Sequence, residues 1–412
     1  MTMAEVDAIA TGPRPSIGSA VLPARPVVTK ARLLVVDDIE MNRDLLARRL
    51  TGQGYHVEMA EGGAQALAML QAAPFDLVLL DIMMPDMDGY EVLRRIRGDV
   101  VLQHLPVVMV SALGETESVV RCIELGADDY LTKPFNPLVL KARVTASLSR
   151  KWLRDREQLY AQSLTRELDI GRQIQAGFLP QGCPQPKGFS IAAHFEPARS
   201  VGGDFYDVFT LHNGHVALIV ADVCDKGVGA ALYMALFRTL LRATALQESM
   251  VERGDAQLLG DVVAHTNEYI AVTHDHANMF ATVFFGILDP RTGTLLYING
   301  GHDAPIIASP DGPRARLEPT GPALGLMGDS HFALAEDRLA PGELLLAYTD
   351  GVTDARRSSD GATFGEDRLR ALLAGSETAG AVLERVKASL VDFTGDGPPF
   401  DDVTMLAVRR GA

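Results

Sequence analysis

The stretch Phe75-Asp76-Leu77-Val78-Leu79-Leu80-Asp81 decides the fold of the first part of the chain. Its continuous apolar run is typical of a parallel strand that is buried on both faces. The run Leu33–Val36 has the same character and is followed directly by Asp37 and Asp38. Open α/β sheets bind their ligands at the carboxyl ends of such strands. If both strands lie centrally in one sheet, Asp37, Asp38 and Asp81 converge on one crevice.

Two further side chains add to the chemistry expected at this crevice. Carboxylates that lie close together repel unless a cation joins them, and a cluster of oxygen ligands suits Mg²⁺. Ser111 and Lys133 each follow another short apolar run, so both are expected at strand ends. A hydroxyl and an amine beside a metal can bind the oxygens of a phosphoryl group. Asp81 would then be a nucleophile that accepts phosphate as an acyl phosphate.

The ordered motifs of this segment resemble the receiver domain of two-component response regulators. They are Val35–Asp38, Asp81–Gly89, Gly126–Tyr130 and Lys133–Phe135. The resemblance covers roughly residues 30 to 150 and implies a flavodoxin-like fold with a five-stranded parallel sheet. It also implies phosphorylation of Asp81 by a histidine kinase or a phosphotransfer protein, and the carbonyl of Met83 as a further Mg²⁺ ligand. The alternative is a nucleotide-type fold whose carboxylates only cap strands.

Bulk composition limits the classes of function. A chain of 412 residues with 47% hydrophobic content is expected to form two or three domains. The net charge of −15 argues against nucleic acid as a main partner. The three cysteines, Cys122, Cys183 and Cys224, have unrelated spacings, which fits a reducing cytoplasm. No apolar run predicts a membrane span and no secretory signal is recognisable.

The chain is predicted to divide into four parts: a disordered tail at 1–29, the receiver domain at 30–147, a helical linker at 148–180 and a second domain at 181–412. The section Val144–Phe178 has no strong turn signal and indicates one long helix. Two neighbouring apolar stripes run along it: Leu148, Trp152 and Leu159 on one, and Leu153, Tyr160, Leu164 and Leu168 on the other. Two interpretations stay open. The helix is either a solvated connector or a coiled coil that pairs with its copy in a homodimer.

The second half has the pattern of a different fold class. Strands are expected at Val216–Ala221, Met279–Leu288, Thr294–Asn299 and Glu343–Tyr348, and helices at Val228–Gln247, Gln257–Val272 and Thr378–Asp392. The turn Asp289–Gly293 between two of these strands indicates an antiparallel hairpin. Together the patterns predict an α+β domain.

Several carboxylates in this half stand beside glycines or at strand ends. They are Asp204, Asp222, Asp350, Asp401 and Asp402. Adjacent glycines let the backbone turn sharply and let a metal or water approach. Oxygen ligands without His or Cys favour Mg²⁺ or Mn²⁺, and two such ions can clamp a phosphoryl group. Taken singly, each Asp-Gly pair also fits an ordinary turn.

The order of the motifs resembles the metal-dependent serine/threonine phosphatases of the protein phosphatase 2C (PPM) class, in their sporulation and stress-response branch. The motifs are Ser200–Asp207, Asp222–Val223 with Lys226–Gly227, Met279–Thr282, Asn299–His302, Leu324–Gly325, Thr349–Asp354 and Asp401–Thr404. The segment Glu167–Gln175 through Pro180 also resembles the helix that leads into this branch. The resemblance covers about 170 to 410 and implies a β-sandwich flanked by helices.

The resemblance also implies a metal site that holds two Mn²⁺ or Mg²⁺ ions. In it, Asp222 would bridge both ions and the carbonyl of Val223 would bind one. Asp350 and Asp401 would complete the set of ligands, and Asp402 stays open as the alternative to Asp401.

Four more residues are expected at or near this site. Asp204 would orient the water that attacks the substrate. The family usually has Ser and Gly after the aspartate-valine pair, where this chain has Cys224 and Asp225. The side chain of Asp225 would either perturb the metal site or face solvent. His302 is either a catalytic acid or a structural residue that holds a loop.

These patterns predict a cytoplasmic response regulator whose output domain is a protein serine/threonine phosphatase. The family resemblance implies that the substrate is a phosphorylated anti-sigma factor antagonist. The alternative is a pseudophosphatase that binds an anti-sigma or antagonist partner without catalysis. Whether phosphorylation raises or lowers the output stays open.

Overall fold

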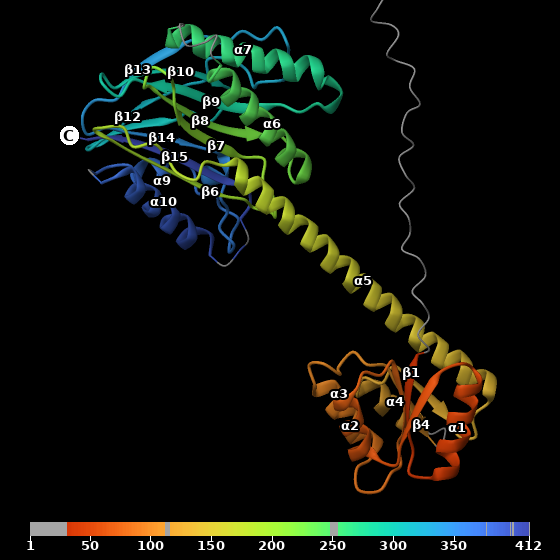
Figure 1. Cartoon of the computed structure of the whole chain (residues 1–412). Coiled ribbons are helices and arrows are strands. Elements are labelled where there is room, and N and C mark those ends of the chain that lie inside the picture. Colours follow the sequence, from red (N-terminus) through yellow and green to blue (C-terminus); the bar gives the residue numbers. More distant parts are fainter. Residues whose placement is uncertain are drawn as a thin grey trace, which may run out of the picture. The chain divides into compact units, whose positions relative to one another are not determined.

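The structure is a computed structural model that describes residues 31–111, 116–247, 254–375, 377–395, 397 and 399–411. The chain forms two compact units, Met1–Gln162 and Ser163–Ala412, which divide inside the helix α5 (Pro137–Phe178) (Figure 1). The tail expected at 1–29 lies outside the described residues. The domain limits drawn from the sequence remain predictions.

The first unit contains one parallel sheet. Its strands are β1 (Arg32–Val36), β2 (His56–Ala60), β3 (Leu77–Asp81), β4 (Val107–Ser111) and β5 (Asp129–Thr132), in the order β2-β1-β3-β4-β5. Val36 pairs with Leu80 in the ladder between β1 and β3. The residues that follow these two, Asp37 and Asp81, therefore leave the sheet at the same edge. The expected five-stranded parallel sheet is confirmed.

Helices cover both faces of this sheet. They are α1 (Glu40–Gly52), α2 (Gly63–Ala72), α3 (Gly89–Gly98), α4 (Thr116–Glu124) and the start of α5. Leu34 and Leu80 pack in a cluster with residues of α2 and α3. Leu33 and Leu79, one position earlier, pack in another cluster with residues of α1 and α5. Because β3 is buried along its whole length and β1 along most of it, the sequences of these two strands are largely continuous apolar runs rather than alternating patterns.

The long helix expected between the two halves is confirmed, and it begins earlier than the sequence indicated. α5 has 42 residues, a length of roughly 63 Å at helical geometry. Its first turns, with Leu140, Val144 and Leu148, pack in the receiver core. Trp152 and Tyr160 are exposed farther along. The coiled-coil interpretation remains a prediction. In the described part of the chain, no helix combines the length and the apolar run of a membrane span.

The second unit is built on two antiparallel sheets. One has the order β13 (Ala335–Arg338), β10 (Thr294–Gly300), β9 (Ala281–Leu288), β8 (Val216–Val223), β7 (Phe205–Thr210). The other has the order β12 (Gly312–Arg316), β11 (Ile306–Ser309), β14 (Leu344–Tyr348), β15 (Val403–Arg410), β6 (Phe189–Glu196). The expected hairpin is the β9–β10 pair.

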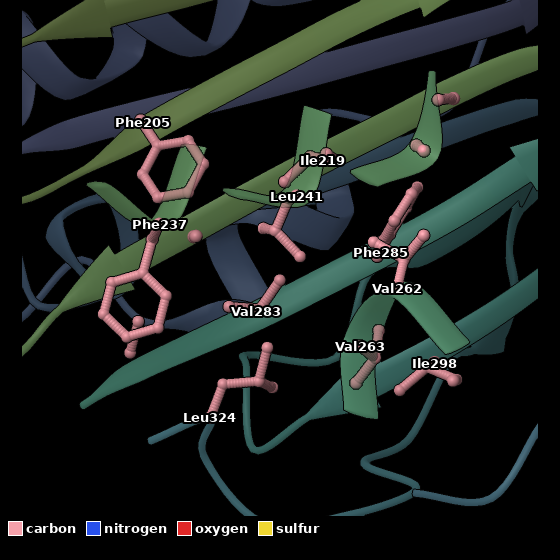
Figure 2. Packing of buried hydrophobic residues seen from close by; sticks show 14 of the residues in the cluster. Phe205, Ile219, Phe237, Leu241, Val262, Val263, Val283, Phe285, Ile298 and Leu324 are labelled. Carbon is pink, nitrogen blue, oxygen red and sulfur yellow. The ribbon is translucent and has the colours of Figure 1, made fainter. Parts of the chain in front are cut away.

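Helices cover the outer faces of the two sheets. They are α6 (Val228–Ala245), α7 (Asp255–Thr273), the short 3-10 helix η2 (Asp275–Ala277), α8 (Asp350–Thr353), α9 (Glu366–Ala371) and α10 (Ala379–Thr394). Phe237 of α6, Val262 of α7 and Phe285 of β9 belong to one buried cluster, which Figure 2 shows. A second cluster, which includes Leu218 and Leu406, joins the two sheets. A third joins the other sheet to α9 and α10. The expected β-sandwich flanked by helices is confirmed.

Candidate active sites

Three carboxylates and one amine meet at the carboxyl edge of the receiver sheet. Carboxylate oxygens of Asp37, Asp38 and Asp81 lie within 4.8 Å of one another. Asp37 and Asp81 are buried and Asp38 is exposed. The Nζ atom of Lys133 lies 2.7 Å from Oδ2 of Asp37 and 3.0 Å from Oδ1 of Asp81. The structure thus brings together the four side chains that the sequence grouped.

The charges at this edge do not balance. Burial raises the pKa of Asp81, Lys133 lowers it, and the charges of Asp37 and Asp38 raise it. Burial alone would lower the pKa of Lys133, but its hydrogen bonds to Asp37 and Asp81 raise it, so the amine stays charged. One amine faces three carboxylates. The oxygen donors and their excess negative charge therefore fit a divalent cation such as Mg²⁺.

Local backbone geometry fixes two of these carboxylates. Oδ1 of Asp37 accepts hydrogen bonds from the backbone N–H of Ile39 at 3.0 Å and from Nδ2 of Asn42 at 3.1 Å. A Cβ atom at Gly89 would lie 2.2 Å from the backbone carbonyl oxygen of Asp81. Only glycine therefore lets the start of α3 approach the end of β3 this closely.

The remaining receiver candidates lie at or next to the same edge. Ser111 ends β4, one position after Val110, which pairs with Asp81. The backbone N–H of Lys133 donates to the carbonyl of Ser111 at 2.7 Å. Met83 lies in the loop that follows Asp81, with an exposed side chain. The binding roles of Ser111 and of the Met83 carbonyl remain predictions.

Carboxylates of the second unit come from both of its sheets, and their charges raise the pKa values of Asp222 and Asp350. Burial raises the pKa of Asp222 to about 7, with further contributions from Asp350 and Asp401. Burial and then Asp401 raise the pKa of Asp350 to about 6. A bound divalent cation would compensate this repulsion between carboxylates. Among the described residues, no three carboxylates of this domain lie within 4.8 Å of one another, so this set is wider than that of the receiver.

Hydrogen bonds distinguish Asp402 from Asp401. Oδ1 of Asp402 accepts from the backbone N–H of Ala198 at 2.8 Å, and Oδ2 accepts from that of Gly203 at 2.7 Å. Both oxygens of Asp402 therefore hold the loop before β7. Asp401 instead forms an ion pair with Lys226, with 2.6 Å between Oδ2 and Nζ. The geometry favours Asp401 as the metal ligand and Asp402 as a support for the loop.

Asp204 is buried and held by two hydroxyl groups. Its Oδ2 atom accepts hydrogen bonds from Oγ1 of Thr349 at 2.6 Å and from Oγ1 of Thr404 at 2.8 Å. Burial and the nearby charge of Asp222 raise the pKa of Asp204 well above its usual value. Neither threonine was predicted from the sequence to lie at the site. The only signal was their position inside the motifs that contain Asp350 and Asp402.

Glycines let carboxylates and carbonyls of this site come close to the backbone. A Cβ atom at Gly203 would lie 2.8 Å from the carbonyl oxygen of Val223, which is a predicted metal ligand. A Cβ atom at Gly351 would lie 1.9 Å from the backbone oxygen of Asp402. Gly351 directly follows Asp350, so it allows α8 to pack against the segment before β15. The glycines of the Gly203-Asp204 and Asp350-Gly351 pairs therefore allow close backbone packing in addition to turns.

The end of α5 is hydrogen-bonded to the same loop. Nε2 of Gln175 donates to the carbonyl of Gly202 at 2.6 Å, and the N–H of Gly202 donates to Oε1 of Gln175 at 3.1 Å. Gln175 is buried, so water does not compete for these bonds. Gly202 lies two positions before Asp204. This Gln175–Gly202 clamp was not anticipated from the sequence.

His302 has the environment of a structural residue. It is buried, and its Nδ1 atom lies 2.8 Å from Oγ1 of Thr282. Its backbone N–H donates to Oδ1 of Asn299 at 2.8 Å. Burial lowers the pKa of His302 to about 4, so the ring is neutral near pH 7. This arrangement favours the loop-holding role over that of a catalytic acid.

The unusual Cys224-Asp225 pair keeps the local backbone geometry that glycine would supply. Asp225 has φ of 73°, in the left-handed region. Its exposed side chain accepts a hydrogen bond from the N–H of Lys226 at 2.8 Å. The Sγ atom of Cys224 accepts from the N–H of Phe280 at 3.2 Å. Of the two alternatives for Asp225, the structure favours the one in which its side chain faces solvent.

Substitutions at Asp225 should therefore affect stability according to their tolerance of positive φ. We expect Asp225→Gly to change the free energy of unfolding by less than about 1 kcal/mol, since relief of strain offsets the greater entropy of the unfolded chain. We expect Asp225→Val to destabilise by about 1–3 kcal/mol, because a β-branched residue is strained there. Scanning calorimetry of the full chain measures both. A valine variant that melts no lower than the glycine variant would contradict the backbone argument.

Comparisons with known families agree with the two domains. Residues 33–145 match the response regulator receiver domain family. Residues 212–411 match the family of stage II sporulation protein E, SpoIIE. The two matches lie on either side of the region in which α5 ends and the second unit begins.

Individual relatives are similar to only part of this chain. Protein IcfG of Synechocystis sp. is 43% identical over 264 residues, which are 59% of this chain and 41% of that protein. Response regulator PleD of Caulobacter vibrioides is 47% identical over 120 residues, which are 29% of this chain and 26% of that protein. The chain therefore spans less than half the length of these two relatives.

One solved structure is similar to the second unit in fold. The SiaA-PP2C domain of Pseudomonas aeruginosa matches with a TM-score of 0.51 and 24% identity, covering 61% of this chain and 98% of that domain. This likeness shows that the second unit shares the fold of that domain. The chain thus contains a segment that matches the response regulator receiver domain family, followed after helix α5 by a segment that matches the SpoIIE family.

Proposed function

We propose that this chain is a response regulator whose receiver controls a metal-dependent protein serine/threonine phosphatase. The observation that carries the proposal is the convergence of Asp222, Asp350 and Asp401 in a domain of the SpoIIE family. The burial and mutual charge that raise the pKa values of Asp222 and Asp350 would be compensated by bound cations. All the ligands that the resemblance implies are present, which favours a phosphatase over a binding adaptor.

In this proposal the phosphatase residues have distinct roles. When bound, two Mn²⁺ or Mg²⁺ ions would supply Lewis acidity for hydrolysis of a phosphoester. The carboxylates of Asp222, Asp350 and Asp401 and the carbonyl of Val223 would hold them. Asp204, fixed by two threonine hydroxyls, would orient the attacking water.

The receiver would perform the regulatory phosphoryl transfer. An oxygen of Asp81 attacks the phosphorus of a phosphohistidine, on a histidine kinase or phosphotransfer protein, and the bond from phosphorus to the histidine nitrogen breaks. Lys133 lies close enough to bind an oxygen of the transferred group, and Ser111 would bind another. Mg²⁺, held by Asp37, Asp38, Asp81 and the Met83 carbonyl, would offset the added charge.

The substrate and the cellular setting are further parts of the proposal. The motif resemblance to the sporulation and stress-response branch supports a phosphorylated anti-sigma factor antagonist as substrate. The exposed apolar side chains of α5, including Trp152 and Tyr160, support a homodimer formed along this helix. The cysteine content supports a cytoplasmic protein, and neither nucleic acid nor membrane is proposed as a partner.

The direct test uses the purified full chain with a phosphoserine peptide and with p-nitrophenyl phosphate. We expect hydrolysis of both with Mn²⁺ and no hydrolysis after removal of divalent cations with EDTA. Activity should return when Mn²⁺ is added back in excess. Absence of hydrolysis with every divalent cation, while peptide binding persists, would favour the adaptor instead.

Control of the phosphatase by the receiver should depend on the rotational phase of α5. Insertion of two residues after Arg156 rotates the following helix by about 200°, whereas seven residues change its phase by only about 20°. We expect both variants to keep basal hydrolysis of p-nitrophenyl phosphate. The response to acetyl phosphate should be lost with two inserted residues and kept with seven.

The two insertions serve as controls for each other, since both lengthen the helix and only one changes its phase. An unchanged response in the two-residue variant would show that α5 is only a tether. Loss of the response in both variants would show that length or direct domain contact matters more than phase.

A further inference from the structure

A pocket rich in positive charge lies in the phosphatase domain. It has a volume of about 390 Å³, and its basic lining residues are Arg199, Lys226, Arg356 and Arg357. Within the described residues, the lining includes no Asp or Glu. The whole chain has a net charge of −15, so this surface has the opposite sign to the protein average. The pocket is therefore suited to an anionic ligand.

The pocket adjoins the proposed metal site. Nζ of Lys226 lies 2.6 Å from Oδ2 of Asp401. Phe400, another lining residue, directly precedes Asp401. On the other side, Arg199 follows Ala198, whose N–H donates to Oδ1 of Asp402 at 2.8 Å. A ligand in the pocket would thus lie beside the reacting phosphoryl group rather than on it.

Two of the basic side chains are available to a ligand. Lys226 is paired with Asp401, and Arg357 with Asp360 at 3.1 Å. Arg199 and Arg356 are exposed, and among the described residues neither has a carboxylate within 4 Å.

Arg356 is also held in place by an aromatic ring. Its guanidinium carbon lies 3.8 Å from the ring centre of Phe400, and Nζ of Lys226 lies 5.3 Å from the same centre. Stacking of this kind fixes the guanidinium plane and leaves its N–H groups free to bind a carboxylate with two parallel hydrogen bonds. The group is therefore partly ordered before a ligand binds.

We propose that this pocket binds acidic side chains that flank the phosphorylated Ser or Thr of the protein substrate. The inference rests on the proposed phosphatase function and names a feature of the substrate. The phosphoryl group itself would be bound by the metal ions at Asp222, Asp350 and Asp401. Arg199 and Arg356, which have no carboxylate partner among the described residues, are then available for carboxylates a few positions away along the substrate chain.

The test compares two phosphopeptides that differ only in Glu or Gln residues next to the phosphoserine. For the unaltered protein we expect kcat/KM to be at least tenfold higher for the Glu peptide, with the difference in KM. In the double variant Arg199→Gln, Arg356→Gln, this preference should fall below twofold. Its hydrolysis of p-nitrophenyl phosphate, which has no flanking residues, should stay within twofold of the unaltered rate. Arg291→Gln, in the exposed turn between β9 and β10, is the matched control.

A binding measurement separates the inference from the proposed function. Fluorescence anisotropy of both labelled peptides with the Asp222→Ala variant tests the pocket without turnover. We expect the Glu peptide to bind at least fivefold tighter, and added Arg199→Gln and Arg356→Gln changes to remove this difference. Equal binding and equal kcat/KM for the two peptides would overturn the inference. Tighter binding without hydrolysis by the unaltered protein would leave the pocket assignment standing and overturn the phosphatase proposal.

Discussion

The Asp222→Ala variant is expected to lower Mn²⁺-dependent hydrolysis of p-nitrophenyl phosphate by more than about 100-fold, since loss of even an outer partner of a metal ligand costs about 10- to 100-fold. Asp222 lies near the end of β8, where burial and the charge of Asp350 raise its pKa. Its loss would remove the carboxylate proposed to bridge both ions. We expect a comparable loss for Asp350→Ala.

Steady-state rates over a range of Mn²⁺ concentrations measure this effect. Asp311→Ala is a suitable control, because this exposed carboxylate lies in the turn between β11 and β12. Circular dichroism should show that all three variants stay folded. Near-normal rates for Asp222→Ala and Asp350→Ala at saturating Mn²⁺ would refute the metal assignment.

The second large effect is expected in the receiver, where Asp81→Asn should abolish phosphorylation. An amide cannot form the acyl phosphate that a carboxylate forms. The structure leaves Asp81 within 3.0 Å of Lys133, and both are held at the sheet edge with Asp37. Asparagine has nearly the same shape, so we expect the fold to be kept.

Incubation with acetyl phosphate and Mg²⁺, followed by separation on a phosphate-affinity gel, measures the modification. Asp44→Asn, on the outer part of α1, should be phosphorylated as efficiently as the unaltered protein. Full labelling of the Asp81→Asn variant would show that another residue accepts the phosphoryl group.

The fold and the site of the receiver could be predicted because the residues that determine them lie in short, continuous segments of the sequence. A strand that is buried on both faces has a continuous apolar sequence, and Leu77–Leu80 and Leu33–Val36 have that sequence. Parallel pairing of these strands then fixes which residues meet at the sheet edge. The sequence alone therefore predicts that Asp37, Asp81 and Lys133 lie close together.

The phosphatase half was less predictable, because its supporting contacts join residues that are far apart in sequence. The hydroxyl of Thr404 and the carboxylate of Asp204 are separated by 200 positions. Edge strands such as β12 and β13 are short and largely exposed, so their sequences have little apolar periodicity. The choice between Asp401 and Asp402 depended on hydrogen bonds from Ala198 and Gly203, which no sequence pattern indicates.

The Gln175–Gly202 clamp has a consequence for where one module ends and the next begins. Gln175 belongs to helix α5 by its secondary structure, yet its side chain forms hydrogen bonds with both backbone groups of Gly202, in a loop of the second unit. A fragment cut at the end of α5 would leave the N–H and C=O of Gly202 without this partner. A fragment that keeps this contact therefore starts upstream of Gln175, and the last turns of α5 belong structurally to the second unit.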